Sequence, residues 1–166
     1  MRLELRGAAD GDVVARVDHG LPGGEIVRDG GELRVGFNAA LGTDGIRQSA
    51  ALAARSLRRT GGIVAWRLDD GLDVPAEEQV RALVEGTAFG AYDPGLRKRD
   101  YAARPELVLA LDAPESLRAL AERQTVVARH VDGARNLANL PPNELTPVAL
   151  AAYAQRLDHG LSLIHI

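Results

Sequence analysis

Apolar positions in the first forty residues alternate over short runs, and glycine-containing turns separate these runs. Alternation with a period of two is typical of strands that bury one face. The pattern predicts three short strands, Leu3–Leu5, Val13–Val17 and Leu33–Phe37. The turns between them are predicted at Asp10-Gly11, Pro22-Gly23-Gly24 and Asp29-Gly30-Gly31, because glycine readily takes up the backbone conformations of tight turns.

After residue 40 the apolar spacing becomes helical. A first helix is expected to end at Gly61-Gly62, with Thr43 or Asp44 as its cap. Its inward face is formed by Ile46, Ala50, Ala53, Ala54 and Leu57. The apolar run Ile63–Trp66 follows as a buried strand. The period therefore changes from helix to strand within about twenty residues.

A second helix is expected to begin near Pro75, where the missing N–H costs little, and Glu77 and Glu78 suit its amino-terminal end. Its inward residues are Val80, Leu83, Val84, Thr87, Ala88 and Ala91. Leu107–Leu111 is the next predicted strand. Strands that alternate with helices after residue 40 favour an α/β fold, with a mixed β-sheet flanked by helices.

Pro114 is expected to open a third helix that runs towards Asn139, with Gly133 as the point where it could bend or break. It cannot continue through Pro141-Pro142. The residues expected on its inward face are Leu117, Leu120, Ala121, Val127, Ala128, Val131 and Leu137. A fourth helix is predicted from Thr146-Pro147, a cap followed by a first-position proline, with an apolar face of Leu150, Ala151, Ala154 and Leu157.

Composition excludes several kinds of chemistry. The chain has no cysteine, so disulfides, cysteine-bound zinc and a cysteine nucleophile are excluded. The net charge of −3 gives no reason to expect nucleic acid or an acidic membrane surface as a partner. No apolar run is long enough to span a bilayer, and the charged start Met1–Arg6 is unlike a signal peptide. A cytoplasmic location is therefore expected.

No catalytic, cofactor-binding or metal-binding residue is predicted within this sequence. The four histidines lack metal-ligand spacing, and His130 is expected at the surface of a helix. Asp69-Asp70 and Glu77-Glu78 are interpreted as solvated pairs. The glycine-rich stretches fit neither a phosphate loop nor a dinucleotide fingerprint, and no serine lies in a nucleophile elbow.

The segment Arg135-Asn136-Leu137-Ala138-Asn139-Leu140-Pro141-Pro142-Asn143-Glu144-Leu145-Thr146-Pro147 resembles the hinge signature of the leucine aminopeptidase (cytosol aminopeptidase) family. In that family the pattern is approximately A-R-D-L-x-N-x-P-x-N-x-L-T-P, and it leads from the amino-terminal domain into the catalytic domain. Asn136 stands where aspartate is usual. Upstream, Glu85–Tyr92 is similar to a family helix that ends in Gly-x-x-x-x-x-Tyr, and Leu96-Arg97-Lys98 occupies the region of a Tyr-Lys pair.

The resemblance implies an amino-terminal, non-catalytic α/β domain over residues 1–132, followed by the hinge and the first helix of a truncated catalytic domain over 133–160. Residues 161–166 are expected to be a non-native tail, because they match a transposon end used in sequencing libraries. The full-length protein would remove amino-terminal, leucine-like residues from peptides with two divalent metals, manganese or zinc, as a cytoplasmic homo-hexamer. The fragment alone is expected to be inactive.

Two alternatives stay open at this point. The family's amino-terminal domain is similar in fold to macro domains, which bind ADP-ribose through glycine-rich loops; here Gly20–Gly24 and Phe37–Gly45 would be those loops. DNA binding through Arg55, Arg58 and Arg59 is the second alternative. Nucleic acid is the weaker partner, because three arginines at the end of one helix complement the helix dipole in a chain of net charge −3.

Overall fold

The fold is built on one six-stranded sheet, described here from a computed structural model that covers residues 1–94 and 105–157. The strand order is β1-β6-β5-β2-β4-β3, and every neighbouring pair is parallel except β3 and β4. The sheet is therefore mixed, as predicted. Its strands are β1 (Arg2–Glu4), β2 (Val13–Asp18), β3 (Ile26–Asp29), β4 (Glu32–Gly36), β5 (Gly62–Arg67) and β6 (Leu107–Asp112).

Five of these strands lie where the sequence predicts them, within one or two residues at each end. The structure adds β3, an edge strand that the pattern does not predict. β3 forms an antiparallel hairpin with β4, with Ile26 opposite Val35 and Asp29 opposite Glu32. It is short and mostly exposed, so its position is fixed by backbone pairing rather than by a buried apolar face.

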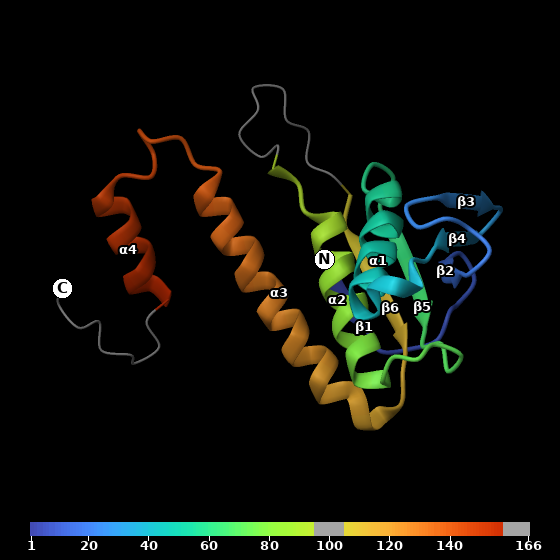
Figure 1. Ribbon diagram of the computed structural model, residues 1–166. Helices are drawn as coiled ribbons and strands as arrows, with labels where there is room; N and C mark the ends of the chain where they lie inside the picture. Colours follow the sequence, from blue (N-terminus) through green and yellow to red (C-terminus); the bar gives the residue numbers. More distant parts are fainter. Residues whose placement is uncertain (95–104, 158–166) are drawn as a thin grey trace.

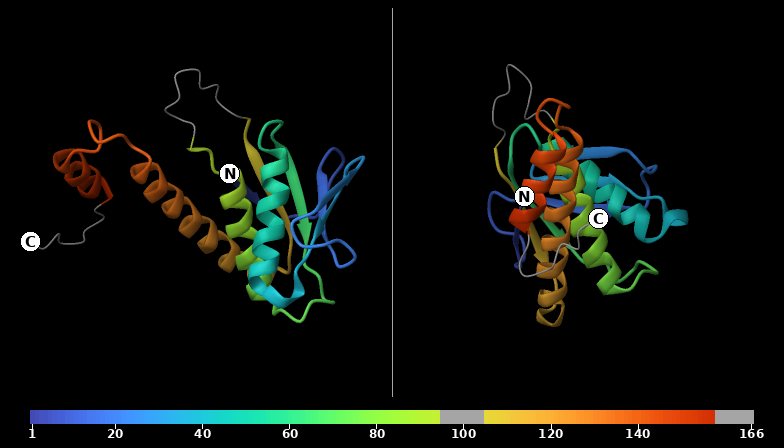
Figure 2. Two further views of the ribbon diagram at one scale, coloured as in Figure 1. Left: turned by 45° about the horizontal axis from the view of Figure 1, so that its top comes forward. Right: turned by 90° about the vertical axis from the view of Figure 1, so that its left-hand side faces the viewer.

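The helices α1 (Thr43–Leu57) and α2 (Ala76–Ala91) cover one face of the sheet (Figures 1 and 2). The core lies between them and the inward side chains of the strands. All the predicted inward residues of α1 are buried, and those of α2 are buried except for Ala91 at its end. The largest fully buried apolar side chains are Leu33, Ile46, Leu57, Leu109, Leu111, Val35, Val64, Val80 and Val84.

The amino-terminal caps of these helices differ from the prediction. Gly42, with φ of 50°, is the cap of α1, and Thr43 and Asp44 are already helical. This positive φ favours glycine at that position, whereas a threonine or aspartate there would be strained. At α2, Pro75 is the cap and Ala76 the first helical residue. Glu77 and Glu78 lie in the first turn, as expected.

Helix α3 (Arg118–Ala138) follows a 3-10 turn at Glu115–Leu117 and runs without interruption through Gly133. Its first half packs along α2, and its second half extends away from the sheet towards α4 (Pro147–Leu157) (Figure 1). The prediction that Val127 and Val131 face the core is wrong: they are 44% and 38% exposed. The residues of α3 that are buried are Ala121, Gln124 and Ala128.

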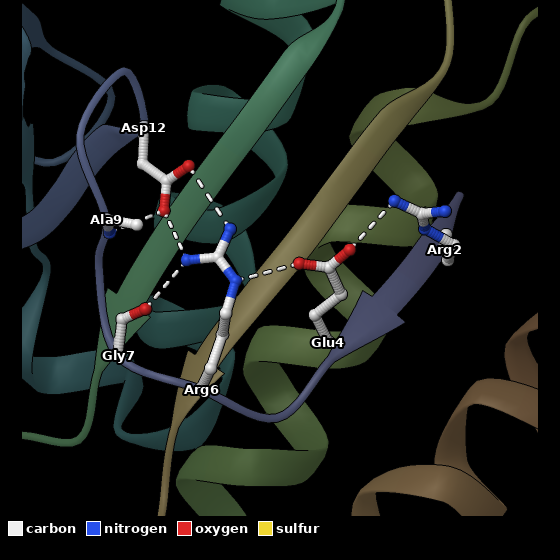
Figure 3. A network of polar contacts seen from close by, with 6 residues as sticks. All are labelled: Arg2, Glu4, Arg6, Gly7, Ala9 and Asp12. Atoms are coloured by element: carbon white, nitrogen blue, oxygen red, sulfur yellow. Dashed lines mark hydrogen bonds and ion pairs between the residues drawn. The ribbon is translucent and has the colours of Figure 1, made fainter.

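The opposite face of the sheet is covered by no helix among the described residues, and ion pairs cross it instead (Figure 3). Arg6 lies between Glu4 and Asp12, 2.8 Å from the first carboxylate and 2.6 Å from the second. The carboxylate of Asp12 also accepts the backbone N–H of Ala9 at 2.8 Å. Arg2 extends this network by pairing with Glu4 at 2.8 Å. This face therefore combines charged residues with the buried alanines Ala65 and Ala110 of its central strands.

The pair formed by Arg6 and Asp12 should make stability depend on pH. The hydrogen bond from Arg6 lowers the pKa of Asp12 below its ordinary value of 3.8. A carboxyl with a lower pKa in the folded state contributes stability above its unfolded pKa, and this contribution is lost as the pH falls through the folded value. Asp12→Asn is therefore expected to lower the midpoint of thermal unfolding at pH 7, and the difference from the parent should shrink below pH ~4.

Asp29→Asn is the matched control, because Asp29 is exposed on the edge strand β3. It should leave the unfolding midpoint nearly unchanged at every pH. A difference between Asp12→Asn and the parent that stayed constant down to pH ~3 would contradict the assigned ion pair.

Candidate functional site

The two segments that carry the family resemblance meet in space at the end of α2. The guanidinium of Arg135, on α3, lies 3.7 Å from the ring centroid of Tyr92 and 5.6 Å from that of Phe89. The side-chain amide of Asn139 donates to the hydroxyl of Tyr92 at 2.9 Å and to the carbonyl of Arg135 at 2.8 Å. The last turn of α3 is thus fixed to the carboxyl end of α2. We call these four residues the hinge joint.

Close helix packing places Tyr92 in this joint. α1 and α2 cross where Gly86 and Gly90 face Ala50 and Ala54. A Cβ at Gly86 would overlap the carbonyl oxygen of Arg47 and lie 2.8 Å from the Cβ of Ala50. Only glycine allows the two backbones to approach so closely. This contact explains the glycine of the Gly-x-x-x-x-x-Tyr segment, which begins at Gly86 and ends at Tyr92.

Polar contacts hold α3 against α1 and α2 below the joint. Glu85 accepts a bond from Arg47 at 2.7 Å and another from Gln124 at 2.6 Å, so one carboxylate links three helices. Within α3 itself, Asp132 pairs with Arg135 at 3.3 Å, although burial raises the pKa of Asp132. The two bonds to Glu85 help to fix the direction in which α3 leaves the sheet.

The chain turns sharply after the joint. The carbonyl of Pro141 accepts the backbone N–H groups of Glu144 and Leu145, and the hydroxyl of Thr146 accepts that of Ala149 at 3.2 Å. Thr146 is therefore the predicted cap of α4, and Pro147 is its first residue. The predicted helix, proline turn and capped second helix are all confirmed.

Comparison with known proteins gives the same family repeatedly. A "Probable cytosol aminopeptidase" of Streptomyces avermitilis is 32% identical over 146 residues, which are 78% of this chain and 28% of that protein. Others of that name, from Cenarchaeum symbiosum and Roseiflexus castenholzii, are 33% and 35% identical and cover 85% and 78% of this chain. No family model matches the chain. Over the residues it spans, the chain belongs to the cytosol aminopeptidase family.

Solved structures share this fold. The bottromycin maturation enzyme BotP in complex with Mn is 26% identical, with a TM-score of 0.69 over 89% of this chain and 36% of that one. A tomato leucine aminopeptidase mutant has a TM-score of 0.66 at 20% identity, which shows a shared fold. The chain spans about 28% of the length of the cytosol aminopeptidases that it matches.

The described part of the chain, residues 1–94 and 105–157, contains no cluster of three or more His, Asp or Glu side chains that could hold a metal. The acidic pairs are instead engaged locally or exposed. Asp69 pairs with His19 at 3.6 Å, and Glu78 pairs with Arg81 at 3.5 Å. His130 is exposed on α3, as predicted. No helix in the described ranges is long and apolar enough to cross a bilayer.

The glycine-rich loops Gly20–Gly24 and Phe37–Gly45 pack against each other. A Cβ at Gly23 would lie 3.0 Å from that of Asn38, and one at Gly36 would overlap the carbonyl oxygen of Pro22. This packing accounts for Gly23 and Gly36, whereas Gly24 and Gly42 have φ of 95° and 50°, which favour glycine.

One of the arginines considered for DNA binding, Arg58, has a structural role at the hinge joint. Arg58 donates to the carbonyl of Tyr92 at 3.0 Å and so completes the end of α2. Arg55 lines the same cavity of about 490 Å³ as Arg58 and Arg135.

Two other segments, Leu96-Arg97-Lys98 and the tail 161–166, lie outside the described residues.

A second cavity, of about 470 Å³, lies at the carboxyl ends of β2 and β5, and sequence reasoning missed it. Its lining joins His19, Trp66 and Asp70, which are far apart in sequence. The polar residues that directly follow Trp66 are a weak signal of a strand end. That β2 and β5 are adjacent, however, depends on the strand order of the sheet, which the hydrophobic pattern of the sequence does not determine.

The hinge joint gives a direct test in the isolated chain. Tyr92→Ala removes the ring under Arg135 and the bond from Asn139, together about 1 kcal/mol. We expect faster hydrogen exchange at the amides of the last turn of α3. Tyr92→Phe retains the ring and should restore most of the protection, and Ile26→Ala on the exposed edge strand β3 serves as the control. Unchanged exchange in Tyr92→Ala would show that the joint does not hold α3.

Proposed function

We propose that this chain is the amino-terminal, non-catalytic domain of a longer cytosol aminopeptidase, followed by the hinge and the first helix of its catalytic domain. The observation that carries the proposal is the hinge joint, in which Arg135 and Asn139 of the hinge signature contact Tyr92 of the upstream signature. The chain matches about 28% of the length of its relatives, which supports its being one part of a longer enzyme. The domain limit near residue 133 falls within α3.

The intact protein, in this proposal, removes amino-terminal leucine-like residues from peptides with two divalent metals. Two adjacent cations would polarise the scissile carbonyl and lower the pKa of a bound water. The relationship to cytosol aminopeptidases supports the reaction, and the complex of the similar enzyme BotP with Mn supports the metal. The described residues offer no such ligand set, so the metal ligands would lie beyond the hinge.

The described α4 is consistent with a helix that needs further chain to pack against. None of its residues is buried, and Val148 is 79% exposed while Leu150 is 46% exposed. An amphipathic helix gains most of its stability from packing its apolar face. We propose that this face packs in the catalytic domain, and that the intact enzyme is a cytoplasmic homo-hexamer.

A chimera tests the proposal. Residues 1–147 would be joined to the part of the Streptomyces avermitilis cytosol aminopeptidase that follows its own hinge. With manganese or zinc, the chimera is expected to release the chromophore from a leucine anilide, and the 166-residue chain is not. Hydrolysis by the 166-residue chain would overturn the proposed non-catalytic role. A folded but inactive chimera, with the relative active under the same conditions, would argue against the hinge as the shared boundary.

A further inference from the structure

The cavity at the carboxyl ends of β2 and β5 lies where the chain leaves two neighbouring parallel strands in different directions. β2 continues into the hairpin of β3 and β4, whereas β5 leads into α2 over the helical face. Crevices at such points are the usual ligand sites of open α/β sheets. Its volume of about 470 Å³ lies within the range of small-molecule sites.

The floor of this cavity is apolar and buried. Ile46, Trp66 and Leu83 line it with exposures of 1%, 2% and 2%. The indole N–H of Trp66 has no hydrogen-bond partner in the described part of the chain. That nitrogen is itself buried, so it gives no evidence of a polar contact in the cavity. The floor therefore suits an apolar group.

The loop that walls the cavity is fixed in place. The side chain of Gln79, on α2, accepts the backbone N–H of Asp69 at 2.9 Å and donates to the carbonyls of Asp69 and Val74 at the same distance. These three bonds hold residues 69–74 against the start of α2. A preformed wall lowers the entropic cost of binding.

The mouth of the cavity offers one cation and one anion that are not strongly paired. Arg67 is 86% exposed and lies 3.9 Å from its partner Asp112. Asp70 is exposed and forms no hydrogen bond or ion pair with the described residues. Arg16 and Asp69 also line the mouth, but Glu32 and His19 already pair with them. The charges left for a ligand are of both signs.

We propose that this cavity binds a short apolar peptide in its zwitterionic form, with its side chains on the floor, its carboxylate at Arg67 and its ammonium at Asp70. The apolar floor and the two opposite charges each match one part of such a molecule. The inference concerns binding and is independent of the proposed aminopeptidase function.

Trp66 is the only tryptophan of the chain, so its fluorescence reports on this cavity directly. The 166-residue chain would be titrated with L-leucyl-L-leucine. We expect a saturable change in tryptophan emission, and a matching heat by calorimetry. Glycylglycine, which lacks apolar side chains, should bind at least tenfold more weakly. Absence of a saturable change with millimolar dileucine would overturn the proposal.

Paired variants and blocked peptides assign the two charges. Asp70→Asn should weaken binding of dileucine about tenfold and leave binding of N-acetyl-dileucine unchanged, because that peptide has no ammonium. Arg67→Gln should weaken binding of dileucine by a similar factor and leave binding of dileucine amide unchanged, because the amide has no carboxylate. Asp29→Asn, on the edge strand β3, is the control. If both charge variants bound dileucine as the parent does, the assigned pose would be wrong.

Release of free leucine during these titrations would contradict the proposed non-catalytic role without affecting the binding result. Conversely, an active chimera would leave the binding proposal untouched if dileucine failed to bind. The two proposals can therefore fail separately.

Discussion

Replacing Gly86 with alanine is expected to lower the free energy of unfolding by about 3 kcal/mol, at the upper part of the usual cost of overpacking. The added methyl group would overlap the carbonyl oxygen of Arg47, and backbone atoms cannot move aside as a flexible side chain can. α1 and α2 would have to separate. Because α2 carries Tyr92, the hinge joint should weaken with the core. Urea unfolding followed by circular dichroism measures the loss.

Gly133→Ala is the matched control, since it makes the same chemical change in another helix. A Cβ at Gly133 would meet only the hydroxyl of Tyr153, at 3.2 Å, which is the far end of a movable side chain. Alanine is favoured over glycine in a helix by up to about 1 kcal/mol, so this variant should be slightly more stable than the parent. A similar loss in both variants would show that helix packing does not explain the requirement at Gly86.

The sequence predicts α1 and α2 well because their apolar residues repeat at helical spacing and all pack on one sheet. Thr87 on α2 is fully buried, as its place in the stripe requires. The same reasoning fails for α3 because the helix is longer than the surface on which it packs. Val131 continues the helical repeat of Ala121, Gln124 and Ala128, but it is 38% exposed because the surface on which they pack does not extend over it. Periodicity indicates a face, and only the tertiary structure shows where that face is covered.

Gln124 shows a further limit of hydrophobic pattern. A polar residue on an inward face is not predicted to be buried, yet Gln124 is 5% exposed and donates to Glu85 at 2.6 Å. Glu85 is 39 residues away in sequence, so no local pattern contains the pair. A buried amide is stable only with such a partner.

The hinge illustrates what a motif provides and what it leaves out. Its proline turn and its threonine cap are local features, and both are predicted correctly from residue type. The contact of Arg135 and Asn139 with Tyr92 joins two motifs that the sequence presents separately. Both motifs occur in this chain, and the structure explains this because their residues form one contact. The cavity beside Trp66 could not be predicted, because it depends on β2 lying next to β5.

Replacing Leu109 with alanine is expected to lower the free energy of unfolding by about 2–5 kcal/mol, the usual cost of truncating a fully buried leucine. Leu109 is 0% exposed and lies on β6 between Leu3 of β1 and Val64 of β5. The three side chains form a row across the sheet that faces the helices. Strands paired on both sides cannot easily close the space that the missing methyl groups leave. The loss of unfolding free energy should therefore be much larger than that caused by a substitution at the surface.

Val126→Ala on α3 provides that surface comparison, because Val126 is 49% exposed. Its effect should stay within about 0.5 kcal/mol. Both variants would be unfolded in urea, with the slope of the transition compared as well as its midpoint, since an unchanged slope shows that the same surface is exposed on unfolding. A loss below about 1 kcal/mol for Leu109→Ala would mean that β6 does not form the centre of the core and that the row from β1 to β5 is wrongly placed.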